Sequence, residues 1–344
     1  MTKTSAGRFF EDYSLGEVLS HAVPRTVSGG ERALYHALYP SRFALYSSDE
    51  FARSCGLAAS PLEDLAAFHM VFGKTVPDVS LNAVANLGYA QGRFLKSVWP
   101  GDTLRAESRV IGLRQLSNGK TGIVWVQTLG LNQRGETVLD YVRWVMLRKR
   151  DAAAPAPETV VPDLAPAVAA EDLVVPEGLD FTGYDFTLAG EPHRWADYRV
   201  GEIIDHVDGV TLQEAEHMMA TRLWQNTAKV HFDVTARPDG RPLIYGGHII
   251  SLARALSFNG LANAQMIVAI NGGAHANPAF AGTTVRAWSE VLDKAHVPAP
   301  GVGALRLRLV AVADGTAPGA LKDAEGKYLP GVLLDFDYWA LLPL

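Results

Sequence analysis

The hydrophobic pattern marks one helix most clearly. The run Gly247–Leu256 is apolar on nearly every face that a helix would present, so it predicts a helix buried in a core rather than one on the surface. Shorter helices are predicted at Gly30–Leu38 and at Gln213–Leu223, each after a short strand. Helical segments of this kind therefore occur in both halves of the chain.

Strands are predicted after each helical region. The turn Ser117–Lys120 contains Asn-Gly and precedes Thr121–Gln127, a run rich in β-forming residues, and this combination is typical of a β-hairpin. The cluster Asn271–Gly273 lies in a strand-rich region and predicts a bulge or turn. Further strands are predicted at Thr137–Leu147, Ala304–Val312 and Val332–Leu342. Each half therefore has helices followed by an antiparallel meander.

The two halves also repeat each other residue by residue. Phe10–Val18 is similar to Trp195–Ile203, which lies 185 positions further along the chain. The register continues without a gap and aligns His21 with His206, Thr26 with Thr211, Glu31 with Glu216 and Leu38 with Leu223. We interpret the chain as a tandem duplication.

The duplication divides the chain into three parts. Residues 1–150 form the N-terminal copy, residues 151–184 a linker rich in Ala and Pro, and residues 185–344 the C-terminal copy. The composition of the linker favours neither a helix nor a central strand and predicts a semi-extended connection. Its length lets the second copy fold back beside the first. The predicted fold class is a duplicated α+β fold.

Composition narrows the function classes. Of the 344 residues, 48% are hydrophobic and 20% charged, and the formal net charge is -6. A nucleic-acid-binding protein normally carries a basic excess, so we expect no nucleic-acid partner. No segment approaches the roughly 18 uninterrupted apolar residues of a membrane span. Because the N-terminus is polar and lacks a signal-peptide core, we expect a cytoplasmic protein without a membrane partner.

A motif in the second copy resembles a known family. The MaoC-like, R-specific enoyl-CoA hydratases carry an Asp, then a His five positions later, then an Asp two positions further on. Thr221–Asp233 resembles that motif. Its three positions are here Asn226, His231 and Asp233. The segment Arg241–Gly247 resembles the family's approach to its buried helix.

The resemblance extends over both copies. The turn Pro100–Leu104 also looks like that family, whose fold implies a double hotdog: two tandem units, each an antiparallel sheet wrapped round a central helix. The duplicated layout and the segment Gly7–Tyr13 more narrowly resemble the mesaconyl-CoA (2-methylfumaryl-CoA) hydratases. That resemblance implies a hydro-lyase that interconverts mesaconyl-CoA and β-methylmalyl-CoA, with an acyl-CoA thioester as substrate and no separate cofactor.

Three alternatives stay open. They are a MaoC-like hydratase of another enoyl-CoA, a hotdog thioesterase, and a non-catalytic acyl-CoA-binding hotdog protein. Turnover of crotonyl-CoA in place of mesaconyl-CoA would mark the first, and release of free CoA the second. Ligand-dependent thermal stabilisation without product would mark the third. Exposed sheet edges also permit a homo-oligomer.

The family's functional residues can be carried over position by position. Its catalytic His falls on His231, and its Asp falls on Asn226, which departs from the family's pattern. The equivalent positions of the first copy are Ser41 and Tyr46, and neither suits proton transfer near neutral pH. The resemblance therefore implies that the C-terminal copy is catalytic, while the degenerate N-terminal copy supplies scaffold and substrate pocket.

Hydration of an enoyl thioester needs a base for water, an acid for the α-carbon and donors for the thioester oxygen. His231 suits the base because an ordinary histidine is largely neutral at cytoplasmic pH. Asn226 can hold the water through its amide. Without the family's Asp, either His231 makes both proton transfers or another carboxylate reaches the site. Asp233, Glu63 and Asp64 are the candidates, and the sequence does not choose among them.

The substrate oxygens also need partners. Gly246 and Gly247 lie at the start of the buried helix, where unpaired N–H groups and the positive end of the helix dipole favour an oxyanion. Glycine lets a substrate carbonyl approach closely. A free carboxylate is best bound by an arginine in fork geometry, and Arg42 and Arg222 are the hypotheses.

The remaining polar residues are predicted to be structural. His248 lies inside the apolar helix and is expected to pack there, whereas His21 and His206 recur in the repeat and suggest a shared structural role. The lone Cys55 is expected to behave as a small buried hydrophobe. Dispersed histidines and a single cysteine predict no metal site.

Overall fold

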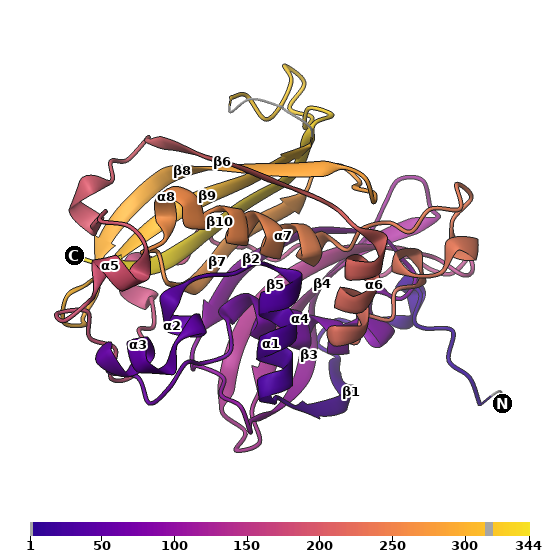
Figure 1. Ribbon diagram of the computed structural model, residues 1–344. Helices are drawn as coiled ribbons and strands as arrows, with labels where there is room; N and C mark the ends of the chain where they lie inside the picture. Colours follow the sequence, from indigo (N-terminus) through magenta and orange to yellow (C-terminus); the bar gives the residue numbers. More distant parts are fainter. Residues whose placement is uncertain (1–2, 314–318) are drawn as a thin grey trace.

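The computed structural model describes residues 3–313 and 319–344. It contains one ten-stranded antiparallel sheet in the order β1-β3-β4-β5-β2-β7-β10-β9-β8-β6. The sheet curves around two helices, α4 (Asp64–Thr75) and α7 (Gly246–Leu256), as Figure 1 shows. Each half is thus an antiparallel sheet wrapped round a helix, which confirms the predicted α+β double hotdog.

The strand order of one half is the mirror image of the order in the other. The first half contributes β1 (Val18–Thr26), β2 (Ala83–Phe94), β3 (Thr103–Gln115), β4 (Thr121–Leu131) and β5 (Thr137–Arg148). The second contributes β6 (Ile203–Thr211), β7 (Met266–His275), β8 (Thr284–His296), β9 (Val302–Ala313) and β10 (Val332–Pro343). The halves join where β2 pairs with β7, with Tyr89 opposite Gly273 and Arg93 opposite Ala269. This symmetry is what a tandem duplication predicts.

The two central helices lie inside the curved sheet, which is why most of their residues are apolar. Every residue of α4 is buried, and in α7 only the first and last residues are not. The other α-helices are α1 (Gly29–Leu38), α2 (Ala44–Ser47), α3 (Asp49–Ser54), α5 (Phe186–Ala189), α6 (Glu214–Leu223) and α8 (Phe258–Leu261). Short helical turns lie at η1 (Phe10–Asp12), η2 (Val76–Ser80), η3 (Ala170–Asp172), η4 (Trp195–Asp197), η5 (Lys229–His231) and η6 (Val234–Ala236).

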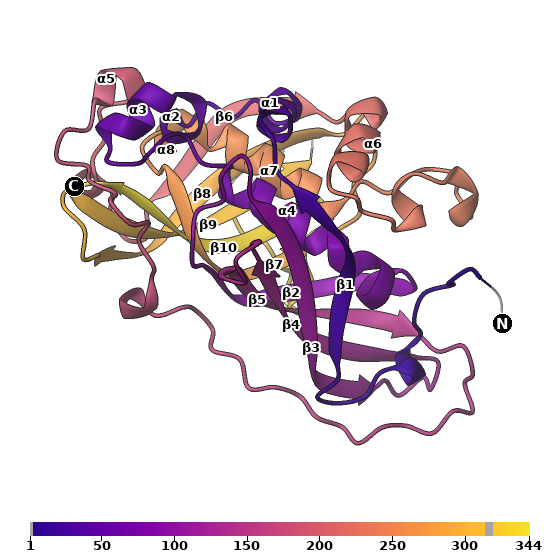
Figure 2. The same cartoon turned by 90° about the horizontal axis from the view of Figure 1, so that it is seen from below.

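The segment between the copies, residues 151–184, is largely extended and packs against the sheet. Figure 2 shows it crossing the side of the sheet that lies opposite α4 and α7. Val160 forms an isolated β-bridge with Leu113 of β3. Further along, Val168 donates its N–H to Asn271 of β7 (2.8 Å) and accepts from the indole of Trp339 (3.0 Å). The segment therefore fastens both halves to each other besides connecting them.

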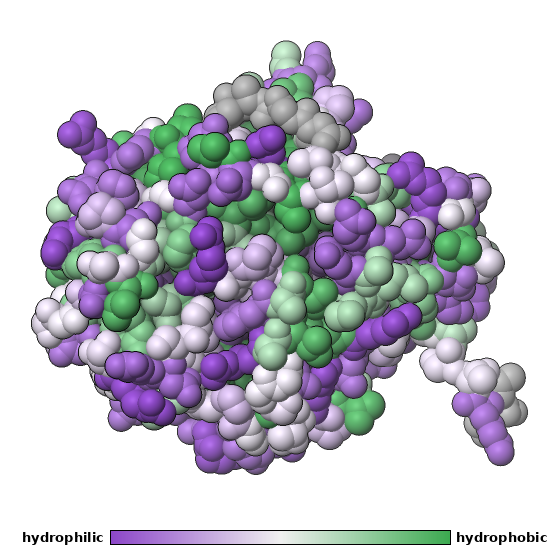
Figure 3. Space-filling model, in the orientation of Figure 1, coloured by the Kyte–Doolittle hydropathy of each residue, from purple (hydrophilic) through white to green (hydrophobic). Residues whose placement is uncertain are grey.

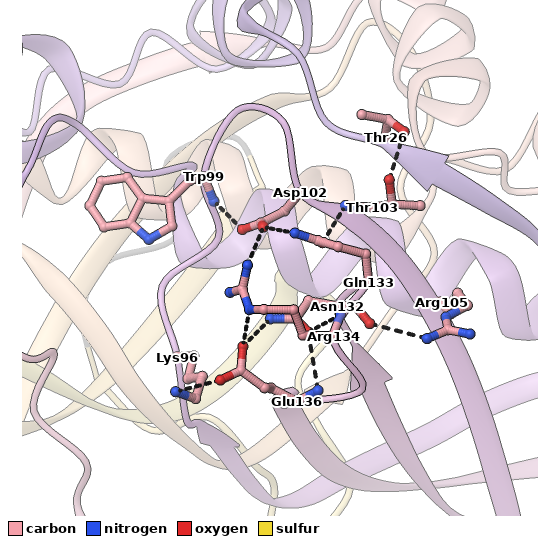
Figure 4. A network of polar contacts seen from close by, with 10 residues as sticks. All are labelled: Thr26, Lys96, Trp99, Asp102, Thr103, Arg105, Asn132, Gln133, Arg134 and Glu136. Atoms are coloured by element: carbon pink, nitrogen blue, oxygen red, sulfur yellow. Dashed lines mark hydrogen bonds and ion pairs between the residues drawn. The ribbon is translucent and has the colours of Figure 1, made fainter.

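The family-like turn before β3 is held by one buried carboxylate. Asp102 accepts hydrogen bonds from the backbone N–H of Trp99 (2.9 Å) and the side-chain amide of Gln133 (2.7 Å) (Figure 4). Arg134 lies beside it and pairs with Glu136 at 2.7 Å. These contacts tie the turn that precedes β3 to the turn between β4 and β5. Pro100–Leu104 thus has a structural role here.

The two histidines of the repeat share a structural role, as predicted. His21 is buried between Asp78 and Ser108, with both hydrogen bonds at 2.8 Å. His206 contacts the backbone oxygen of Asn259 and the hydroxyl of Ser289, also at 2.8 Å each.

Three further local predictions are confirmed. The pairing of β7 with β10 skips Asn271, which is the predicted bulge. His248 is buried and hydrogen-bonds to the hydroxyl of Tyr39. Cys55 is buried, and burial raises the pKa of its thiol to about 11, so it stays a protonated packing residue.

The surface mixes polar and apolar residues. Figure 3 shows hydrophilic and hydrophobic residues interspersed over the face seen in Figure 1. Within residues 3–313 and 319–344, no helix is long and apolar enough to cross a membrane. The same residues contain no group of three or more His, Cys, Asp or Glu side chains placed to hold a metal ion.

Candidate active site

A cavity of about 510 Å³ lies between the two copies. Its walls come from α4, η2, β2 and β5 of the first copy and from η5, the start of α7 and β7 of the second. Polar residues on its walls include Ser80, Asn86, Tyr89, Arg143, Arg148, Asn226, Lys229, His231, Tyr245 and His275. The cavity therefore combines residues that lie far apart in sequence.

His231 faces the cavity from the short turn η5. Its Nδ1 lies 2.7 Å from the backbone oxygen of Leu243. Since a carbonyl only accepts, Nδ1 carries the proton and Nε2 keeps its lone pair. Burial lowers the pKa of His231 to about 4, so the ring is neutral near pH 7. The ring is thus held in the tautomer that a general base needs.

Asn226 is buried on the same wall. Its Oδ1 accepts a hydrogen bond from the N–H of Ala228 at 3.0 Å, which fixes the carboxamide in a local turn. With the oxygen engaged in this way, the Nδ2 group is the part of the side chain best suited to bind water or substrate.

The start of α7 lacks side chains where the cavity meets it. Gly246 lines the cavity, and a Cβ at this position would collide with the ring of His275. Gly247 follows, and a Cβ there would collide with the ring of Tyr245. Both positions therefore need glycine for close packing, and the first backbone N–H groups of the helix have no partner within it.

His275 is a site residue that the sequence reasoning missed. It ends β7 and contacts the hydroxyl of Tyr89 through Nε2 at 3.0 Å, while its buried Nδ1 has no hydrogen-bond partner among the described residues. Burial, and to a lesser extent the charge of His231, lowers the pKa of His275 to about 4. No local motif marks this residue, because only the pairing of β7 with β2 brings it to Tyr89.

Arg143 is the second residue that was missed. Its side chain is fully buried in the cavity wall, donates to the hydroxyl of Thr75 at 2.6 Å and lies over the ring of Phe72 at 4.3 Å. The available signal was a single cation inside the otherwise apolar run Val142–Leu147 of a predicted strand.

Comparison with known proteins places the chain in a family. A family model described as mesaconyl-CoA hydratase matches residues 1–319. The chain belongs to the mesaconyl-CoA hydratase family. It is 77% identical over 341 residues to a protein of Cereibacter sphaeroides named mesaconyl-CoA hydratase, covering 99% of both chains. It is 58% identical over 346 residues to a protein of Chloroflexus aurantiacus named beta-methylmalyl-CoA dehydratase, covering 99% of this chain and 98% of the relative.

Solved structures agree with the family and the fold. A MaoC domain protein dehydratase from Chloroflexus aurantiacus superposes with a TM-score of 0.97 at 58% identity, covering 100% of this chain and 99% of the other. A conserved hypothetical protein from Mycobacterium tuberculosis, described as a double hotdog, superposes with a TM-score of 0.75 at 23% identity over 98% of both chains. The second likeness supports the fold alone.

The carboxylates proposed from the sequence lie outside the cavity of this mesaconyl-CoA hydratase family member. Asp233 accepts from the N–H of Thr235 at 3.0 Å and caps η6. Glu63 and Asp64 lie at the start of α4, where they accept hydrogen bonds from Ser41 and Tyr46. Among the cavity-lining residues that the structure describes, none is Asp or Glu.

The two arginines proposed from the sequence also lie elsewhere. Arg42 is exposed, and its guanidinium lies 4.3 Å from the ring centre of Phe258. Arg222 is exposed in the last turn of α6. Neither residue lines the cavity that contains His231, whereas Arg143 does.

Proposed function

We propose that this chain adds water to mesaconyl-CoA to give β-methylmalyl-CoA, and that it catalyses the reverse dehydration. Family membership and the names of the two relatives support the reaction. The observation that carries the assignment to this cavity is His231, a neutral imidazole with a free Nε2. The walls add three cations, Arg143, Arg148 and Lys229, which suit a substrate that is anionic at both ends.

His231 is the proposed acid and base. Its Nε2 accepts a proton from the water whose oxygen bonds to the β-carbon, while the alkene electrons move toward the thioester. The imidazolium then returns the proton to the α-carbon, which restores the neutral ring and completes the product. Since no Asp or Glu lies among the described lining residues, we assign both steps to this one group. The low pKa of His231 makes its protonated form a strong donor in the second step.

The start of α7 is the proposed oxyanion site. The thioester oxygen becomes negative during the attack, and it would accept from the backbone N–H of Gly246 or Gly247 at the positive end of the helix dipole. Asn226 lines the same side of the cavity as His231, and its Nδ2 would donate a hydrogen bond to the attacking water. Together these groups place the water, the base and the oxyanion donors in one cavity.

The CoA part of the substrate is assigned to the exposed cations. Arg148 and Lys229 line the cavity and remain exposed, so their charges can meet the phosphates of CoA without a large desolvation cost. A cytoplasmic location and a possible homo-oligomer stay predictions from the sequence.

The function is tested by following loss of enoyl-thioester absorbance with mesaconyl-CoA and identifying the product. We expect the His231→Ala variant to lose roughly 10²- to 10⁴-fold in kcat, because it lacks the group that moves the proton. A thiol reagent run in parallel reports CoA release and so detects a thioesterase. Unchanged turnover in the alanine variant, with a native circular dichroism spectrum, would refute the mechanism.

A further inference from the structure

The positive charge of Arg143 has no counter-charge in the structure. Among residues 3–313 and 319–344, no acidic side chain lies within 4.0 Å of this guanidinium, and its Nε has no hydrogen-bond partner. Its shortest contact is with the neutral hydroxyl of Thr75 at 2.6 Å, and the Ser80 hydroxyl is 3.5 Å away. A buried cation without an anion lowers the stability of the folded state. A site that retains one is therefore suited to bind an anionic ligand.

The repeat shows that the fold does not need this charge. Asp140 and Trp144 correspond to Asp335 and Trp339 in the second copy, which places Tyr338 at the position of Arg143. Tyr338 is equally buried and packs inside the second sheet. A neutral residue therefore occupies the same place in the second hotdog, so the fold does not require a charge there.

Arg143 also affects the pKa of a neighbouring residue in the cavity. Burial raises the pKa of Tyr89, and the charge of Arg143 opposes that rise. The same Tyr89 hydroxyl contacts His275, whose ring lies against Gly246 at the start of α7. Arg143, Tyr89 and His275 all line one cavity with His231. The uncompensated charge therefore faces the same cavity as His231 and the proposed oxyanion site, and Tyr89 and His275 lie between it and Gly246.

We propose that Arg143 recognises the free carboxylate of the substrate and so selects enoyl-CoA thioesters that carry an acid group on the β-carbon. This inference rests on the proposed function, because mesaconyl-CoA bears its free carboxylate on the carbon that water attacks. The guanidinium can form two parallel hydrogen bonds to a carboxylate. That contact supplies the missing anion and directs the β-carbon toward the water held near His231.

The test compares two unreactive ligands that differ only in that group. Methylsuccinyl-CoA keeps the carboxylate, 2-methylbutyryl-CoA has a methyl group in its place, and neither has a double bond to hydrate. Calorimetric titration of the full chain should show that methylsuccinyl-CoA binds more tightly, on the order of ten- to a hundredfold. In Arg143→Met that preference should disappear, while the Kd of 2-methylbutyryl-CoA changes by less than about threefold.

Two further variants separate the possible causes. Arg143→Lys keeps the charge but not the forked guanidinium, so it should keep only part of the preference for methylsuccinyl-CoA. This variant also tests the proposal if Arg143→Met does not fold. Arg148→Met is the matched control, because it should weaken both ligands equally through their common CoA. A wild-type protein without the preference, or Arg143 variants that keep all of it, would overturn the proposal. A wild type that shows the preference but does not hydrate mesaconyl-CoA would refute the proposed function alone.

Discussion

The first turns of α4 and α7 occupy equivalent places in the two copies, yet one is filled and the other is open. α4 begins at Asp64, whose carboxylate bonds to the hydroxyl of Tyr46, and the space left there is about 10 Å³. α7 begins at Gly246, and the cavity before it measures about 510 Å³. A carboxylate side chain therefore occupies the start of α4, whereas the first two residues of α7 carry no side chain.

The two places also differ in charge. The filled one holds the buried pair Glu63 and Asp64, and Arg254 opposes the rise of both pKa values. The open one holds the cation Arg143, with no acidic side chain of the described residues within 4.0 Å. The polar groups at the start of α4 thus satisfy one another, whereas the cavity before α7 contains a charge, contributed by β5 of the first copy, that is left for a ligand.

The largest effect is expected from closing the open site. In Gly246→Ala the added Cβ meets the His275 ring, so we expect kcat/KM for mesaconyl-CoA to fall on the order of 10²-fold, because small displacements of reacting groups cost that much. Gly246→Asp imitates Asp64 of the filled site and should lower activity further. Gly183→Ala is the control, since a Cβ there meets nothing within 4 Å. Full activity in the alanine variant would show that the glycine is not what keeps the site open.

The acids of the filled site are expected to affect the free energy of unfolding rather than activity. Burial raises the pKa of Glu63 and of Asp64 to about 7, above their unfolded values near 4. The folded state therefore binds more protons than the unfolded state, and their contribution to stability is lost as pH rises from about 4 to about 7. Each group should account for on the order of 4 kcal/mol over that range.

The measurement for this prediction is a difference between proteins. Buried histidines such as His206, whose pKa burial lowers to about 4, change stability with pH in the opposite direction. Urea unfolding of wild type and of the Glu63→Gln, Asp64→Asn double variant at several pH values removes that common contribution. The variant should gain stability relative to wild type as pH rises. A constant difference between pH 4 and pH 8 would contradict the assigned pKa values.

Local sequence patterns predicted a duplicated α+β fold, and the family resemblance added the double hotdog and the candidate site residues. The buried helix and the Asn-Gly hairpin depend on neighbouring residues, so local patterns reveal them. The repeat was found by comparing positions 185 residues apart. Asn226, His231 and Gly246 fall within one continuous stretch that carries the family resemblance, and the structure brings all three to one cavity.

The residues that were missed come from strand pairing. His275 and Arg143 lie on β7 and β5, which are brought to either side of β2 by contacts between residues far apart in sequence. Spacing along the chain cannot show such neighbours. Conversely, Arg222 lies within the motif and Arg42 beside Ser41, the first-copy counterpart of Asn226, but both side chains lie at the surface. Proximity in sequence was therefore a poor guide to the carboxylate partner.

The smallest effect is expected at Asp233, which occupies the last position of the family-like motif. Its side chain accepts from the backbone N–H and the hydroxyl of Thr235, so it caps a single turn and does not line the cavity. Asp233→Ala should therefore leave kcat for mesaconyl-CoA within about twofold of wild type, as surface substitutions usually do. Thr235→Val removes the hydroxyl that donates to Asp233, and its kcat should likewise stay within about twofold of wild type. A loss of activity in the first variant comparable to that of His231→Ala would mean that this carboxylate reaches the substrate, and the single-imidazole mechanism would have to be abandoned.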